Sequence, residues 1–152
     1  SNYIAYIEEA FGIDMIKPFS NRTKNELSYY NKIYDADVAL NSIRCPDSRY
    51  DLDHNLENTV YNELLFMDYT LKVFNDSERE VDFVAEKEGK KYFIQVAYSV
   101  QNEKAYEREF RAFANLDNLS QKILITTDEL DYSTSTVRHI KLKDFLLLND
   151  LN

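Results

Sequence analysis

Several residue types are scarce in this chain of 152 residues, and each scarcity excludes a class of protein. Two glycines and two prolines are too few for collagen-like, low-complexity or linker-dominated sequences. The single cysteine, Cys45, excludes a disulfide framework and a cysteine-rich zinc site, and we do not expect it to be catalytic. The two histidines, His54 and His139, are far apart in the chain and form no metal-binding motif. We interpret both as surface or capping groups.

Long apolar runs are also missing, since none approaches the roughly 20 residues that a transmembrane helix needs. No secretory signal pattern is present, so we expect a cytoplasmic protein without membrane contact. The net charge of −9 disfavours binding of nucleic acid by bulk electrostatics but permits a small basic groove. With 44% hydrophobic and 30% charged residues, the chain can fold as one domain with a small appendage.

The first third of the sequence predicts a helix followed by a β-hairpin. Residues 3–11 have apolar side chains at helical spacing, and 13–19 and 27–34 are expected to pair as strands around a polar tip. This arrangement resembles the last third of a winged helix, although a helix and hairpin packed on the main core would give the same pattern. We place the domain boundary near Pro46, between a winged-helix segment at 1–46 and a main domain at 47–152.

The main domain shows a regular alternation of helical and strand patterns. Helices are expected at 52–69 and 101–116, the second with Tyr106, Phe110 and Phe113 in its apolar stripe. Strands are expected at 70–74, 80–86, 91–99, 122–126 and 137–142, followed by helical turns at 143–148. In the second strand, alternation puts Val81, Phe83 and Ala85 on one face and Asp82 and Val84 on the other.

This order, αβββαβ, resembles the core of PD-(D/E)XK nucleases, so the expected fold class is α+β and restriction-endonuclease-like. Such a site needs acids that hold Mg²⁺ and a lysine that orients the nucleophile. The candidate catalytic residues are Glu57, Glu63, Asp82 and Gln95, with Asp82 and Glu63 as candidate metal ligands. Gln95 stands where the third-strand acid is expected and Ala97 where the lysine is expected.

Each candidate also has a structural interpretation. Glu57 is favourable near a helix N-terminus, and Glu63 would be stable beside an arginine such as Arg108 or Arg111. Gln95 would serve as a neutral hydrogen-bonding group. Asp82 is the hardest to explain structurally, because apolar residues flank it in a strand.

Five segments in a fixed order resemble the C-terminal region of prokaryotic AAA-type ATPases. They are residues 3–19, 32–40, 56–64, 80–86 and 94–98. The resemblance implies a winged-helix remnant followed by a nuclease-like domain of unknown function, with family acids at Glu57, Glu63 and Asp82. Many relatives carry an acid and a lysine in the third-strand motif, where this chain has Gln95 and Ala97. The ATP-binding P-loop is absent from this sequence.

We therefore expect an accessory domain with a degenerate nuclease-like site that recognises nucleic acid or a protein partner. Its first partner would be the ATP-binding domain of the same parent chain, and the fragment itself would bind no cofactor. Two alternatives stay open: an active Mg²⁺-dependent nuclease, and a structural or oligomerisation module of the ATPase.

Overall fold

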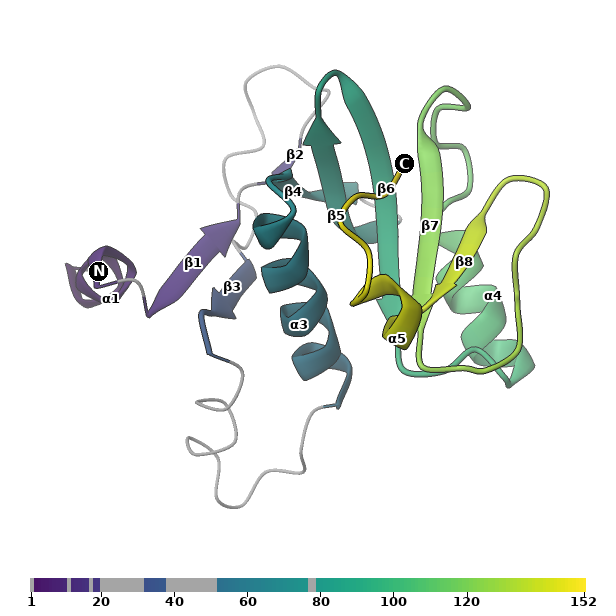
Figure 1. Ribbon diagram of the computed structural model, residues 1–152, viewed down its shortest axis with the longest axis horizontal. Helices are drawn as coiled ribbons and strands as arrows, with labels where there is room; N and C mark the ends of the chain where they lie inside the picture. The colour runs from purple at the N-terminus through teal and green to yellow at the C-terminus, as the bar shows by residue number, and fades with distance from the viewer. Residues whose placement is uncertain (1, 11, 17, 20–31, 38–51, 77–78) are drawn as a thin grey trace.

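A computed structural model describes residues 2–10, 12–16, 18–19, 32–37, 52–76 and 79–152 (Figure 1). The predicted boundary near residue 46 and Cys45 lie outside these residues. The elements are α1 (Asn2–Glu9), β1 (Ile13–Ile16), β2 (Pro18–Phe19), β3 (Lys32–Asp35), α3 (Leu52–Phe66), β4 (Thr70–Asp76), β5 (Arg79–Lys87), β6 (Lys90–Ala97), α4 (Glu103–Arg111), β7 (Gln121–Thr126), β8 (Arg138–Lys141) and α5 (Leu142–Phe145). From α3 to β7 the predicted order αβββαβ is confirmed.

One mixed sheet organises the molecule, with strand order β2-β4-β5-β6-β7-β8. Strands β4, β5 and β6 are antiparallel neighbours, whereas β6, β7 and β8 run parallel. The β5–β6 hairpin turns at Gly89, whose positive φ of 77° is readily available only to glycine. Helix α4 makes the crossover from β6 to β7, as the sequence predicts. In the part of the chain that the structure describes, no helix is long and apolar enough to cross a membrane.

Two apolar cores lie on opposite faces of the sheet. Figure 1 shows α3 and α5 on one face and α4 on the other. The core beneath α3 and α5 includes Leu64, Phe83 and Phe145, all fully buried. The core beneath α4 includes Val84 and Phe113. This three-layer arrangement explains why the central strands are apolar on both faces.

The predicted alternation along β5 is wrong at Val81, because the strand contains a β-bulge. Lys72 pairs with Val84 and Phe74 with Val81, so three steps along β5 oppose two steps along β4. The extra residue turns Val81 into the α4-side core beside Val84, while Phe83 and Ala85 face α3. Bulges re-aim side chains and are frequent beside functional sites. Here the bulge sets the direction of Asp82.

The N-terminal strands form a small two-stranded sheet in which β1 and β3 pair antiparallel, as predicted. The expected strand over 13–19 is divided, however, since β2 pairs with β4 in the main sheet. Strand β3 is attached to α3 through Asn58. The Asn58 side chain accepts from the Asp35 N–H at 2.7 Å and donates to the Asp35 carbonyl at 2.8 Å. These bonds fix β3 beside the main domain.

Candidate functional site

A cleft of about 430 Å³ lies where α3, β5, β6 and α4 meet, and β3 contributes to its wall. Its lining is dominated by charged and polar groups, among them Lys32, Glu57, Glu80, Asp82, Gln95 and Glu109. Three of the four candidate catalytic residues, Glu57, Asp82 and Gln95, line it. Glu63 is half-buried elsewhere on α3 and is not among the lining residues.

Asp82 and Gln95 occupy adjacent strands, as predicted, and the Gln95 side chain contacts the Asp82 backbone. Regular pairing of β5 with β6 ends at Phe83 and Ile94. Beyond this point the Asp82 Oδ2 atom accepts from the Val96 N–H at 3.0 Å, and the Asp82 N–H donates to Gln95 Oε1 at 3.3 Å. Side chains thus replace the backbone ladder, and Asp82 is 5% exposed at the base of the cleft.

Lys32 brings a positive charge into this cleft from β3. Its Nζ atom lies 2.8 Å from Asp82 Oδ1, 2.9 Å from Glu80 Oε1 and 3.3 Å from Glu57 Oε2. The Tyr34 hydroxyl donates to the same Glu57 oxygen at 3.3 Å. Sequence reasoning missed Lys32, because 50 residues separate it from Asp82 and no local pattern joins them.

Burial and crowding shift the ionisation of these groups. Burial, reinforced by the Asp82 charge, raises the pKa of Glu57 to about 7, against the opposing influence of Lys32 and Tyr34. Burial likewise raises the pKa of Asp82, although Lys32 opposes this shift. Burial alone would lower the pKa of Lys32, but the Asp82 and Glu57 carboxylates outweigh it and the pKa rises. Lys32 therefore stays charged, whereas Glu57 exchanges a proton near neutral pH.

Glu109 on α4 is a buried acid that sequence reasoning also missed. Gln95 Nε2 donates to Glu109 Oε2 at 2.8 Å, and Arg108 Nε donates to Glu109 Oε1 at 2.6 Å. The signal was present in the sequence, because Glu109 follows Tyr106 by three residues and so lies on the apolar stripe of α4. Gln95 bridges Asp82 and Glu109 as a neutral group. Arg108 pairs with Glu109 and not with Glu63, contrary to one interpretation above.

The described residues of this cleft do not fit a metal ion. Among the residues that the structure describes, no group of three His, Cys, Asp or Glu side chains is arranged to hold one. The structure does not bring Glu63 to Asp82 in this cleft, and the Lys32 ammonium occupies the point where the carboxylates converge. Ala97, at the expected lysine position, is buried in the α4-side core.

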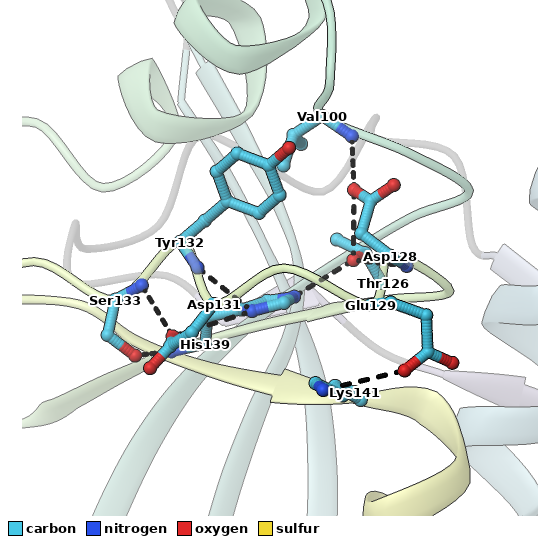
Figure 2. Close-up of polar contacts among 9 residues, drawn as sticks. All are labelled: Val100, Thr126, Asp128, Glu129, Asp131, Tyr132, Ser133, His139 and Lys141. Atoms are coloured by element: carbon cyan, nitrogen blue, oxygen red, sulfur yellow. Dashed lines mark hydrogen bonds and ion pairs between the residues drawn. The ribbon is translucent and has the colours of Figure 1, made fainter.

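A second polar cluster surrounds His139 on β8 (Figure 2). The interpretation of both histidines as surface or capping groups is wrong for His139, whose side chain is buried, while His54 is exposed. His139 Nδ1 accepts from the Tyr132 N–H at 3.2 Å, and Nε2 lies 2.9 Å from Thr126 Oγ1. The bond to Nδ1 assigns the proton to Nε2.

Asp128 completes the second cluster. Its carboxylate accepts from the Val100 N–H and the Ser99 hydroxyl, both at 2.7 Å, and from Gln101 Nε2 at 3.0 Å. Thr126 Oγ1 donates to it at 3.2 Å. The network ties the segment after β7 to the start of β8 and to the segment after β6, and its buried polar groups are paired internally. We interpret it as structural.

The chain belongs to the DUF4143 family, a domain of unknown function whose model matches residues 53–145. It is similar to an uncharacterised protein of Haemophilus influenzae, 29% identical over 126 residues, covering 83% of this chain and 31% of that protein. It is also similar to the uncharacterised protein MJ1544 of Methanocaldococcus jannaschii, 32% identical over 139 residues, covering 84% of this chain and 30% of that protein. The chain thus spans about a third of each relative. No solved structure matches it.

Proposed function

We propose that this chain is the C-terminal accessory domain of an AAA-type ATP-binding protein, with a nuclease-like architecture that recognises nucleic acid without cutting it. Two observations support the parentage. The five resembling segments occur in order, and the relatives are about three times longer than the matched region, which leaves room for an ATP-binding domain. Its test is ATP binding by a full-length relative and by a version truncated to the region matching this chain, where only the full-length protein should bind.

The third strand carries the argument against cleavage. PD-(D/E)XK sites need an acid and a lysine there, and this chain has Gln95 and Ala97. The Gln95 amide is committed to Asp82 and Glu109, and Ala97 packs in the core. Neither position supplies a charge to the cleft, so neither can bind a metal strongly or orient a nucleophile.

A row of cations supports nucleic-acid recognition. Lys104, Arg108 and Arg111 follow one another at spacings of four and three residues, so they share a face of α4. They line a second groove of about 600 Å³ beside the acidic cleft. Lys104 and Arg111 form no ion pair with another described residue, and Arg108 is positioned by Glu109. Asp53 and Glu107 line the groove as well, so its cations outnumber its acids by one, and we interpret it as the small basic groove that an acidic chain would need.

Tyr98 adds an aromatic surface to the same groove. Its side chain is 50% exposed, while its backbone N–H donates to Asp53 Oδ1 at 3.1 Å. An exposed ring on a fixed backbone can stack a nucleobase, and adjacent cations can contact phosphates. The expected ligand is therefore a strand with unpaired bases, since stacking needs an exposed base face.

Fluorescence anisotropy with labelled single-stranded and duplex DNA tests this proposal. We expect binding that weakens steeply with salt, a loss of affinity of at least about tenfold in Lys104→Ala/Arg111→Ala, and a smaller loss in Tyr98→Ala. The matched control is Lys141→Ala/Lys143→Ala, which removes two cations paired with Glu129 on another surface. Equal losses in both double variants, or no binding by the wild type, would contradict nucleic-acid recognition and favour a protein partner or a structural module.

An active Mg²⁺-dependent nuclease is the second candidate, favoured by the convergence of Glu57, Glu80 and Asp82. A plasmid nicking assay with Mg²⁺ and Mn²⁺ decides between them. We expect no nicking above that of an Asp82→Asn control. Metal-dependent nicking that Asp82→Asn abolishes would establish the nuclease.

A further inference from the structure

We infer that Lys32 is an internal cation that takes the place a divalent metal ion would hold in a cleft of this architecture, so that a fixed lysine, in place of a metal, offsets part of the carboxylate charge in the cleft. The inference goes beyond the proposed function, because it concerns the balance of charge in the cleft. It holds whether or not the domain binds nucleic acid.

The first argument is the contact geometry. Three carboxylates from two elements, α3 and β5, converge on one nitrogen at 2.8 to 3.3 Å. A lysine ammonium has three N–H donors, which matches three acceptor oxygens. Mg²⁺ needs oxygens at about 2.0–2.1 Å in near-octahedral order, so the same carboxylates would have to close in around it. The observed spacing is that of an ammonium.

The second argument is the way in which Lys32 is held. The aliphatic stem leaves β3 two residues before Tyr34, which is 1% exposed and stacks on Tyr61 with ring centroids 4.4 Å apart. Asp35, next along the strand, is bonded twice to Asn58 of α3. The strand is therefore anchored on the same helix that carries Glu57. Lys32 reaches the carboxylates from a packed backbone, which lowers the entropy lost in forming the contacts.

The third argument is the charge that would be left without Lys32. Asp82 is buried, and the carboxylates of Glu57 and Glu80 contact the same Lys32 ammonium that Asp82 contacts. Two other cations line the cleft, Arg108, which is engaged by Glu109, and Arg111, for which no ion pair with a cleft carboxylate is found among the described residues. Uncompensated carboxylates at this spacing repel one another, so the folded state would need another cation or a proton.

The experiment compares melting temperatures of the wild type, Lys32→Met and Lys32→Arg with and without millimolar Ca²⁺, Mg²⁺ or Mn²⁺. At pH 8 we expect Lys32→Met to melt roughly 5–10 °C below the wild type. Divalent cations should restore part of that loss in Lys32→Met and leave the wild type unchanged, by mass action on the folded state. Lys32→Arg should melt closer to the wild type, because it keeps the charge.

The control is Lys72→Met, which removes a half-buried lysine paired with Glu86 at 3.0 Å. It should show no cation-dependent recovery. A Lys32→Met protein that melts like the wild type at pH 8, or a wild type that divalent cations stabilise as much as the variant, would overturn the inference. If Lys32→Met does not fold, Lys32→Met/Asp82→Asn decides: recovery of a folded protein supports the inference, and failure to recover contradicts it. DNA binding by the α4 row is measured separately, so either proposal can fail alone.

Discussion

Asp82 and Asp128 are two buried aspartates whose pKa values shift in opposite directions. Their exposures are similar, 5% and 3%. Burial raises the pKa of Asp82, whose carboxylate shares a cleft with other acids and a single lysine. At Asp128 burial acts in the same direction, but bonds from Val100, Ser99, Gln101 and Thr126 outweigh it and lower the pKa.

The difference shows how a protein can use one residue type in two ways. Asp128 is stabilised by neutral donors that are fixed by the backbone, so its charge contributes to folding. The Asp82 charge is compensated by Lys32, which lies far from it in the sequence, and without that lysine the buried charge would destabilise the folded state. The arrangement at Asp128 is typical of structural groups. The arrangement at Asp82, a buried acid with a raised pKa in a cleft, is typical of functional sites.

The largest expected effect comes from replacing the two aspartates by asparagine. Asp128→Asn should lower the free energy of unfolding by about 3 kcal/mol at pH 7, because an amide NH₂ would face donors that need an acceptor. Asp82→Asn should cost about 1 kcal/mol or less, since losing the Lys32 contact is partly offset by relief among the acids. Urea denaturation at pH 7 measures both. An equal loss of stability in the two variants would contradict the proposed difference between Asp82 and Asp128.

The sequence predicted most of the fold, since its periodic patterns are local. The α3 stripe of Leu56, Val60 and Leu64 is buried, and the hairpin around Gly89 forms where it was expected. The β5 bulge could not be predicted, because it depends on the register with β4, which no single-strand pattern contains. The predicted direction of the Val81 side chain was therefore wrong.

The site was predictable only in its local part. The proximity of Asp82 and Gln95 was predictable, because a short hairpin joins the strands that carry them. The approach of Lys32 to Asp82 was not predictable, since it depends on how β3 packs against α3. Glu109 was overlooked among the charged residues of α4, although its position on the apolar stripe indicated burial.

His139 offers the next largest effect and tests whether the second cluster is structural. His139→Ala would leave the Tyr132 N–H without its acceptor and would remove one of the hydrogen bonds of the Thr126 hydroxyl, so we expect a loss of about 2 kcal/mol at pH 7. Burial lowers the pKa of His139 below its ordinary value of 6.5. Its contribution is therefore present above pH 6.5 and is lost as the pH falls, because the unfolded state binds more protons.

The measurement is urea denaturation of wild type and His139→Ala at several pH values between 7 and 5. The difference between the two proteins should shrink toward the acidic end. A difference that stays constant over this range would mean that protonation of His139 does not affect folding. DNA binding at pH 7 should be unchanged, because His139 is not among the residues that line the α4 groove.

Glu57 should show the opposite pH dependence, with a smaller amplitude. Its pKa is raised from 4.5 to about 7, so the folded state binds more protons than the unfolded state between these values. Its stability contribution is complete below pH 4.5 and declines as the pH rises through 7. Glu57→Gln should remove this decline. The free energy of unfolding of the variant, relative to that of the wild type, should therefore be higher at pH 8 than at pH 5 by on the order of 1 kcal/mol. A parallel pH profile for wild type and variant would show that Glu57 does not carry the shifted proton.

The smallest expected effect concerns an ion pair outside both clusters. Lys143 Nζ lies 2.7 Å from Glu129 Oε2, closer than any of the Lys32 contacts, yet both side chains are exposed. Water screens the pair, and ordering two long side chains offsets its attraction. Lys143→Met should therefore leave the urea midpoint unchanged within error, whereas Lys32→Met lowers it. If the two variants were equally destabilised, distance alone would govern these ion pairs, and the burial that distinguishes the Lys32 cleft from the surface would have no energetic consequence.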